Sequence, residues 1–531
     1  MKTRKILLTI IISLSMFVSP LDVITVHAIS YGTTKINGAT LYYSIENDEV
    51  TITSCSEDIS GDVIIPSTLG GYPVTRIGNY AFQFCNSLLS VTIPESIKVI
   101  GECIFDLCDS FERINITNIA TWCNINFESS SCNPLIYTGK LYINGTLATD
   151  IVIPDNVTRI NNNSFYNCDS LTSVTIPDSV TSIGNYAFEN CDSLTSIAIP
   201  DSVTSIGSLA FTGCDLLETI SIGKNVLDIG NYAFTSCNSL SKINVNSENS
   251  SFCSNDGVLF NKNNSRLIFY PKGRKETKYN IPYGTLEICE SAFYNCDILT
   301  EISIPNTLET IGGMAFMSCT SLTSINLPDS VENIGHLAFS DCTSLSTITL
   351  SKNIVNLGGE VFSNTKYIKN PDNWENDVIY IGNYLIEAKR TVADNYLIKP
   401  NTKIIASFSF YGCSSLTTIT IPSTVKNVGE YSFFDCKSLK TVKFLGSKKQ
   451  WDEINIGILN DDLLNANIIF DYIQDLNGDS SLDSADVVLM KKAVLGTNEL
   501  TAEDSEAYDL NGDGKLDILD LIRIKKLLTN V

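Results

Sequence analysis

A phenylalanine recurs along most of this 531-residue chain at a nearly constant interval. Eight of the eleven intervals between successive copies are 23 residues long, and the other three are 60, 59 and 48. A fixed period of this size is typical of a solenoid, in which each repeat forms one coil and buries its apolar side against its neighbours. The period therefore predicts a stack of coils. The recurring residues are Phe82, Phe105, Phe165, Phe188, Phe211, Phe234, Phe293, Phe316, Phe339, Phe362, Phe410 and Phe433.

Each repeat has an apolar pattern that assigns its parts. In one copy, Leu171, Val174 and Ile176 have the L-x-x-L-x-L spacing of a leucine-rich repeat strand. A proline ends this strand, Val180 and Ile183 turn the chain back with apolar contacts, and a glycine precedes the segment that carries the phenylalanine. We expect the strands of neighbouring coils to stack about 4.8 Å apart.

Cysteine is frequent, with 17 copies, and eleven of them lie three residues after the phenylalanine. Equivalent residues on stacked coils have parallel Cα–Cβ bonds about 4.8 Å apart, which is a poor geometry for a disulfide. We therefore expect a ladder of small buried thiols. Cys123 and Cys132 are close enough in sequence to form a disulfide, although nothing requires one. The ladder consists of Cys85, Cys108, Cys168, Cys191, Cys214, Cys237, Cys296, Cys319, Cys342, Cys413 and Cys436.

Residues 1–28 have the pattern of a signal peptide, with a basic start, an apolar run from Ile6 to Val18 and a small-residue exit at Ala28. The run is shorter than the roughly 20 residues that span a bilayer, so we expect a secreted, extracellular chain without membrane insertion. A net charge of −23 argues against nucleic acid and anionic lipid as partners. After residue 28 the chain has a single histidine, His336, at a variable repeat position, which disfavours histidine-dependent catalysis.

Three motifs recur within the period: AFxxC, CxSLxxI and IPxSVxxIG. They resemble the BspA-like class of bacterial leucine-rich repeats, and the resemblance covers about residues 75–445. It implies a leucine-rich repeat solenoid over this range. The long intervals depart from the simple repeat, because they contain paired apolar runs around polar turns. These runs predict hairpin inserts near residues 109–150, 246–285 and 366–400.

The exposed strand positions carry mainly serine, threonine and asparagine, and no aromatic residue. A sugar-binding face is expected to present flat rings, and a catalytic face a pair of carboxylates. This face therefore either binds a protein or glycan weakly over many coils or only keeps the solenoid soluble. The inserts are rich in aromatic residues, most of which we expect in hairpin cores, and a ligand site is first sought there. These residues are Trp122, Phe127, Tyr142, Phe260, Phe269, Tyr270, Trp374, Tyr380, Tyr384 and Tyr396.

Two acidic loops near the C-terminus have the oxygen-rich spacing of an EF-hand calcium loop and begin 34 residues apart. Gly514 holds the sixth, sharp-turn position of the second loop, whereas Ser480 replaces glycine in the first, which predicts a weaker first site. Position 12 is aspartate in both loops, where sensor EF-hands have glutamate. The expected calcium ligands are Asp475, Asn477, Asp479, Ser481, Asp483 and Asp486 in the first loop and Asp509, Asn511, Asp513, Lys515, Asp517 and Asp520 in the second.

A loop followed by one helix, duplicated at the end of a secreted chain, resembles a type I dockerin, and the resemblance covers residues 475–531. It implies a module that folds with two Ca²⁺ ions and docks onto a cohesin module of a scaffoldin in a cellulosome. In such modules the partner contacts loop positions 10 and 11 and a basic pair early in the helix. These residues are Ser484, Ala485, Lys491 and Lys492 in the first half and Ile518, Leu519, Lys525 and Lys526 in the second.

Together these features predict a leucine-rich repeat solenoid of short parallel β-strands with irregular or helical return segments. We expect β-hairpin inserts, small β caps at residues 29–74 and 446–470, and a small all-α calcium-binding dockerin domain. We interpret the chain as a non-catalytic cellulosomal protein whose solenoid binds a protein or polysaccharide in plant polysaccharide degradation, or acts as a spacer. One alternative is a glycoside hydrolase, but repeats and caps fill nearly all of residues 29–470 and leave no room for a separate catalytic domain. The other is a carbohydrate-binding module that uses the aromatic residues of the inserts.

Overall fold

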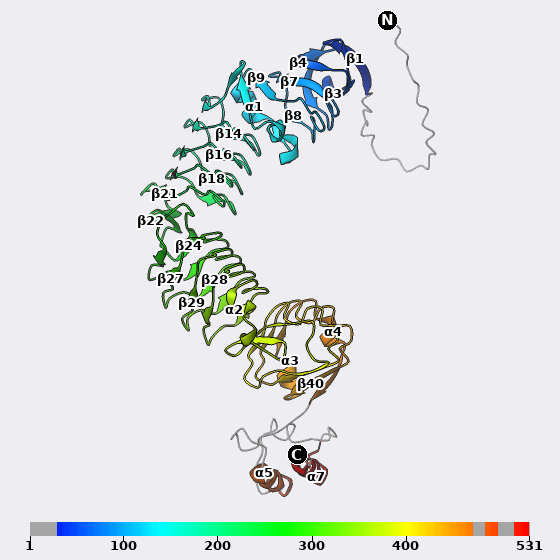
Figure 1. The fold of residues 1–531 in the computed structure, drawn as a ribbon, viewed down its shortest axis with the longest axis vertical. Helices are drawn as coiled ribbons and strands as arrows, with labels where there is room; N and C mark the ends of the chain where they lie inside the picture. Colours follow the sequence, from blue (N-terminus) through cyan, green and yellow to red (C-terminus); the bar gives the residue numbers. More distant parts are fainter. Residues whose placement is uncertain (1–28, 471–483, 497–514, 530–531) are drawn as a thin grey trace, which may run out of the picture.

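The computed structural model describes residues 29–470, 484–496 and 515–529. Coils of the repeat stack on one another along a curved path (Figure 1). This is the solenoid that the 23-residue period predicts. The expected signal peptide lies outside the described residues. Within the described ranges, we find no helix with the length and apolarity that crossing a bilayer requires.

The predicted strands form parallel ladders along one edge of the coils. Ser196 pairs with Thr219, and Thr219 pairs with Lys242, so each step advances by one period. The ladders comprise β4 (Ser60–Ile64), β7 (Ser87–Ile93), β9 (Arg113–Ile116) and β11 (Leu141–Ile143); β13 (Asp150–Val152) and β15 (Ser173–Thr175); β17 (Ser196–Ile199), β19 (Thr219–Ile222) and β21 (Lys242–Val245); β25 (Lys278–Asn280) and β27 (Glu301–Ser303); β29 (Ser324–Asn326) and β31 (Thr347–Thr349); and β36 (Asn395–Leu397), β38 (Thr418–Pro422), β40 (Thr441–Leu445) and β42 (Asn467–Phe470).

A second set of parallel ladders, which the sequence did not predict, runs through the return segments. Val180 and Ile183 are buried as expected, but Ile183 also belongs to a two-residue strand that pairs with the next coil. These ladders comprise β6 (Tyr72–Ile77), β8 (Val99–Ile100) and β10 (Asn126–Phe127); β14 (Arg159–Ile160), β16 (Ser182–Ile183), β18 (Ser205–Ile206) and β20 (Asp228–Ile229); β24 (Arg266–Phe269), β26 (Glu287–Ile288), β28 (Thr310–Ile311), β30 (Asn333–Ile334) and β32 (Asn356–Leu357); and β35 (Tyr384–Ala388), β37 (Ile404–Ile405), β39 (Asn427–Val428) and β41 (Asn455–Ile456).

The segment around each phenylalanine is a series of turns, so the return segments are irregular rather than helical. In one coil, the backbone N–H groups of Tyr186, Phe188 and Asn190 donate to carbonyls of the next coil at 3.0, 2.8 and 2.8 Å. Tyr186 and Asn190 have φ of 58° and 56°, the left-handed region that non-glycine residues seldom occupy. Here the hydrogen bonds between coils offset that local cost. The turns therefore form a third edge of the solenoid, which is hydrogen-bonded from coil to coil wherever consecutive coils follow the 23-residue period.

Most of the recurring phenylalanines that are one period apart stack with nearly parallel rings along the core. The ring centroids of Phe165 and Phe188 are 5.1 Å apart with planes 8° apart, and those of Phe188 and Phe211 are 5.3 Å apart with planes 3° apart. All three side chains are fully buried. Offset stacking at this separation is a favourable aromatic geometry, so the ladder fixes the register of the coils as well as burying apolar surface.

The ladder cysteines are free thiols, and most of them donate a hydrogen bond to a backbone carbonyl of the coil before them. The Sγ atoms of Cys191 and Cys214 donate to the carbonyl oxygens of Phe165 and Phe188, at 3.2 and 3.1 Å. Ten of the eleven are buried and Cys108 is half-buried. Cys123 and Cys132 are also buried free thiols. The thiol therefore serves as a small core residue that also satisfies a backbone carbonyl.

We expect these thiols to be unreactive in the native protein. Burial raises the pKa of Cys168 to about 12, so almost none of it is thiolate at pH 8. Iodoacetamide should therefore modify the ladder cysteines at least about 100-fold more slowly in the native than in the urea-unfolded protein, as counted by mass spectrometry. Disulfides between ladder cysteines of neighbouring coils would contradict this structure.

The neighbouring coil approaches Gly312 so closely that an added side chain would collide with its backbone. A Cβ on Gly312 would lie 2.5 Å from the backbone nitrogen of Glu290, whereas a Cβ on the adjacent Gly313 would meet nothing closer than 3.4 Å. We therefore expect Gly312→Ala to lower the free energy of unfolding by about 3 kcal/mol. Gly313→Ala is a matched control, which we expect to change it by less than about 1 kcal/mol, with urea unfolding as the measurement. Equal effects would show that the stack can relax around an added methyl group.

The three inserts are hairpins whose aromatic residues mostly belong to the core. The hairpins pair β11 with β12 (Thr146–Leu147), β22 (Phe252–Asn255) with β23 (Val258–Asn261), and β33 (Trp374–Glu375) with β34 (Val378–Ile381) and β35. The first insert also contains α1 (Ile119–Asn124), and the third contains α2 (Lys366–Lys369). Seven of the ten aromatic residues are buried, so these are unavailable to a ligand: Trp122, Phe127, Phe260, Tyr270, Tyr380, Tyr384 and Tyr396.

Both ends of the solenoid are closed. At the N-terminus, an antiparallel meander of β1 (Ser30–Ile36), β2 (Ala39–Glu46) and β3 (Glu49–Cys55) pairs with β6, and the short β5 (Thr68–Leu69) also pairs with β6. At the other end lie α3 (Lys448–Asp452) and α4 (Asp461–Leu464). There Asn460 Oδ1 and Asp462 Oδ2 accept the N–H groups of Phe433 and Cys436, each at 2.9 Å. Side chains thus replace the carbonyls of a missing next coil.

Candidate functional site

Two helices near the C-terminus carry the described part of the expected calcium and partner site. Helix α5 (Ser484–Val494) and helix α7 (Ile518–Thr529) pack against each other (Figure 1). Met490 of α5 and Leu521 of α7 are buried. The sequence places an acidic loop directly before each helix, so the two halves of the module repeat the same loop–helix unit.

The last two ligand positions of the second loop cap helix α7. Asp517, at loop position 9, accepts a hydrogen bond on Oδ1 from the N–H of Leu519 at 2.7 Å. Asp520, at position 12, accepts one on Oδ2 from the N–H of Asp517 at 2.9 Å, and its side chain is fully buried. Asp520 thus serves as the N3 residue of a capping box, with aspartate in place of glutamate, while Asp517 caps the N–H of the second helical residue. This arrangement holds two carboxylates together at the positive end of the helix dipole.

The position-12 aspartate has the same place in both halves. Asp486 is the third residue of α5, and Asp520 is the third residue of α7. Lys515, at position 7 of the second loop, is exposed just before α7. The remaining expected ligands lie outside the described residues: Asp475, Asn477, Asp479, Ser481, Asp483, Asp509, Asn511 and Asp513. Among all the described residues, including those of the helix pair, no group of three or more histidine, cysteine, aspartate or glutamate residues is arranged to hold a metal.

The expected partner residues are on the surface of the helix pair. Ile518 and Leu519 are 58% and 53% exposed, and Ser484 and Ala485 are also exposed at the matching positions of α5. Of the four lysines, Lys491, Lys492 and Lys525 are exposed. The side chain of Lys526 lies outside the described residues. The described docking positions of each half are therefore exposed to solvent.

The structure adds two apolar residues that the sequence analysis missed. Ile522 is 44% exposed and lies one helical turn after Ile518, so that it extends the surface made by Ile518 and Leu519. Val488 is 51% exposed at the equivalent place, one turn after Ser484. The i, i+4 spacing from Ser484 to Val488 and from Ile518 to Ile522 is the sequence feature that could have indicated both residues. At loop positions 10 and 11 and one turn after position 10, the second half thus exposes three neighbouring large apolar side chains, whereas Val488 is the one large apolar side chain at these places in the first half.

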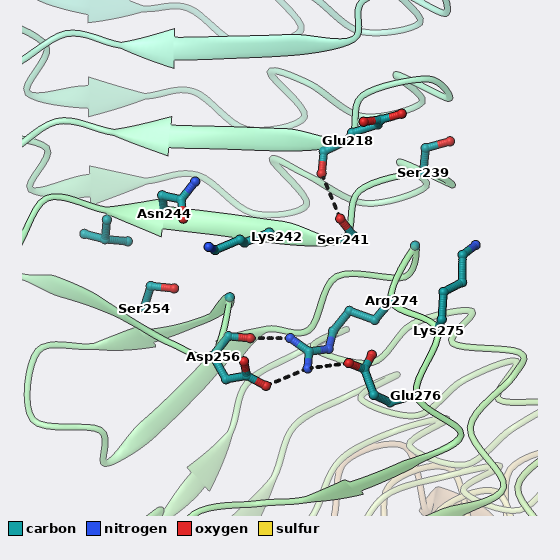
Figure 2. A pocket seen from close by; sticks show the side chains of 13 residues that line it. Glu218, Ser239, Ser241, Lys242, Asn244, Ser254, Asp256, Arg274, Lys275 and Glu276 are labelled. Atoms are coloured by element: carbon teal, nitrogen blue, oxygen red, sulfur yellow. Dashed lines mark hydrogen bonds and ion pairs between the residues drawn. The ribbon is translucent and has the colours of Figure 1, made fainter.

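A polar cleft of about 860 Å³ lies between strand β21 and the second hairpin. Figure 2 shows Arg274 reaching across it toward Asp256 and Glu276, with Nη2 at 2.7 Å from the carboxylate of Asp256 and 3.3 Å from that of Glu276. Arg274 is 8% exposed, and its guanidinium also lies 5.4 Å from the ring centroid of Tyr270. Because these charges satisfy each other, we interpret the cluster as a clamp that fastens the hairpin to the solenoid.

Comparisons with known proteins identify both parts of the chain. A family model for the BspA type leucine-rich repeat region matches residues 61–145, 136–264, 268–393 and 390–460, with six copies. A model for the type I dockerin domain matches residues 473–529. No curated protein matches the chain.

Several solved structures are similar over most of this chain. A leucine-rich cell-surface protein from Faecalibacterium prausnitzii is 30% identical, with coverage of 80% of this chain and 97% of that one and a TM-score of 0.43. A leucine-rich repeat protein from Eubacterium ventriosum is 20% identical, with coverage of 86% and 99% and a TM-score of 0.41. The pneumococcal vaccine antigen PcpA is also 20% identical, with coverage of 83% and 99% and a TM-score of 0.40.

Proposed function

Because the chain belongs to the BspA-type leucine-rich repeat family and ends in a type I dockerin domain, we propose that it is a secreted, non-catalytic protein of a cellulosome. The dockerin binds two Ca²⁺ ions through its two acidic loops and attaches the chain to a cohesin module of a scaffoldin. The solenoid is the cargo, and it contributes a binding surface for a polysaccharide or protein during plant polysaccharide degradation.

The match of residues 473–529 to the dockerin family is the observation that carries this proposal. The geometry of the helix pair supports it in two ways. Asp517 and Asp520 bring two carboxylates together at the start of α7, where a cation with oxygen ligands can bind. Ile518, Leu519 and Ile522 form an exposed apolar surface beside them, of the kind that a protein partner buries.

A pull-down with immobilised cohesins tests the proposal. The chain from residue 29 to 531 is expected to bind at least one cohesin of the same organism in calcium and to be released by EGTA. A chain that ends at residue 470 is the control, since it keeps the solenoid and lacks the dockerin, and it should not bind. Retention of the shortened chain, or calcium-independent retention of the full one, would contradict the proposed attachment.

A further inference from the structure

Four aromatic side chains form a cluster on the turn edge of two neighbouring coils near the C-terminal end of the solenoid. We call Phe408, Tyr411, Tyr431 and Phe434 the aromatic array. Phe408 stacks on Tyr431, with centroids 4.9 Å apart and planes 5° apart, and Tyr411 stacks on Phe434, at 5.6 Å and 12°. The two stacks also touch, with centroids 5.9 Å apart between Phe408 and Tyr411 and 5.8 Å apart between Tyr431 and Phe434. Tyr411 and Phe434 are 39% and 38% exposed.

Only these two coils have an aromatic residue at both repeat positions, which lie two residues before and one residue after the recurring phenylalanine. In every other coil at least one of the two is not aromatic, so the core does not require the array. The other pairs are Tyr80 and Gln83, Cys103 and Asp106, Asn163 and Tyr166, Tyr186 and Glu189, Leu209 and Thr212, Tyr232 and Thr235, Ser291 and Tyr294, Met314 and Met317, Leu337 and Ser340, and Glu360 and Ser363.

The array ends at a cleft where the turn of a coil is replaced by the third hairpin. One period before Phe408 and Tyr411 stand Leu385 and Ala388, which belong to strand β35 and are buried. On this side the imidazole ring of His336 lies 6.0 Å from the ring of Phe408 with the planes 40° apart, but no ring of a described residue stacks on Tyr411. The space is a cleft of about 910 Å³, lined by the four array residues together with Glu360, Ile386, Glu387, Lys389 and Arg390.

The polar groups of the cleft have both signs of charge, and several lack partners. Glu387 is half-buried, and neither it nor Arg390 makes a side-chain hydrogen bond or ion pair with any described residue. Burial raises the pKa of Glu387, and nearby Glu360 raises it further. Arg390 lies against Gly412, where a Cβ would be 3.2 Å from its Nε. Lys389 is engaged elsewhere, 3.3 Å from Asp377 and over the ring of Trp374.

We propose that this cleft binds a neutral polysaccharide, with a sugar ring against Tyr411 and its hydroxyl groups on Glu387 and Arg390. A sugar ring is a flat body whose C–H groups pack on an aromatic surface, and it can extend a stack that the protein leaves incomplete. Its hydroxyls both donate and accept, so one ligand can satisfy a carboxylate and a guanidinium together. The ligand class of the solenoid is then a neutral polysaccharide. The inference rests on the proposed function only in assuming that the chain works on plant polysaccharides.

Other ligand classes fit less well. An aromatic side chain of a partner protein could stack on Tyr411, but it would cover Glu387 and Arg390 without giving them hydrogen bonds. Removing these charged groups from water without new partners costs binding free energy. An anionic polymer would meet two carboxylates, Glu360 and Glu387, against one basic side chain, Arg390, because Lys389 already lies 3.3 Å from Asp377. A neutral polyhydroxyl chain avoids both penalties.

Affinity electrophoresis of the chain from residue 29 to 531 tests this inference. The gels contain hydroxyethylcellulose, xyloglucan, mixed-linkage β-glucan, galactomannan or polygalacturonate. We expect at least one neutral polysaccharide to retard the chain, and Tyr411→Ala to weaken that binding about ten-fold. Glu387→Gln should also weaken it. Tyr294→Ala is the matched control, because Tyr294 has the same repeat position outside the cleft, and it should bind as the parent does.

The contrary outcomes are distinct. Binding of no neutral polysaccharide, retardation by polygalacturonate alone, or equal losses in Tyr294→Ala and Tyr411→Ala would each overturn the inference. Cohesin binding, measured on the same variants, should be unchanged. If the parent chain binds polysaccharide but no cohesin, the proposed attachment is refuted and the polysaccharide site is still supported.

Discussion

Removal of calcium is expected to unfold the C-terminal module while the solenoid stays folded. Helices α5 and α7 have 11 and 12 residues, a length at which an isolated helix is marginal in water. The described buried apolar side chains of the pair are Met490 and Leu521, so packing contributes little. Most of the stability must then come from the metal, which adds about 4 kcal/mol when free calcium is a thousand times the dissociation constant.

The measurement is the far-UV circular dichroism of the full chain minus that of the chain ending at residue 470. This difference reports the module alone, in calcium and in EGTA. We expect its helical signal to be lost in EGTA and the spectrum of the shorter chain to be unchanged. Limited proteolysis provides the second readout, with cleavage after residue 470 only when calcium is absent. A difference spectrum equally helical in EGTA would contradict the requirement for calcium.

The repeat could be predicted in detail because its constraints are local and repeated many times. The spacing of Leu171, Val174 and Ile176 predicted the strand, and the position of Cys191, three residues after Phe188, predicted the thiol ladder. The second strand ladder was missed, since strands of two residues such as Ser182–Ile183 are too short to show an alternating pattern.

The turn edge was harder to predict, for a different reason. Tyr186 and Phe408 have left-handed φ values, which glycine usually adopts and which local sequence does not predict for an aromatic residue. Their N–H groups donate to the adjacent coil, and these hydrogen bonds stabilise the unusual conformation. The sequence shows Phe408 and Tyr411 three residues apart, but only the coil geometry shows that both project from the same edge. The aromatic array therefore could not be predicted from the strand positions and the inserts, where the candidate ligand residues of the sequence lie.

The expected calcium ligands of the C-terminal site rest on loop spacing, which is fixed by the chemistry of calcium, and they stay a prediction. The asymmetry between the halves depends on exposure instead. Ile522 has the i, i+4 relation to Ile518 that a helix face requires, but an apolar helix residue is more often buried than exposed. The structure is what distinguishes Ile522, at 44% exposed, from the neighbouring Leu521, at 6%.

Replacing Ile518 and Leu519 by Ser and Ala is expected to reduce cohesin affinity by at least about 2 kcal/mol, the usual effect of losing a buried apolar anchor. Both side chains are more than half exposed, and they adjoin Ile522, so a partner can bury a continuous apolar surface. The first half offers only Ser484 and Ala485 at these positions. The reverse change, Ser484→Ile with Ala485→Leu, should therefore have a much smaller effect, because the parent makes no apolar anchor there.

The double replacement should leave the module folded, which makes the affinity change interpretable. The hydrogen bond from position 519 to Asp517 uses the backbone N–H, and Asp520 is not altered, so the cap of α7 is retained. Calorimetry with a cohesin of the same organism in saturating calcium measures the loss, and the difference spectrum described above checks the fold. If only the second half supplies an anchor, the dockerin binds in one orientation. Equal losses of affinity from both halves would instead mean that either half can supply the anchor. The dockerin would then dock in two orientations, related by its internal repeat.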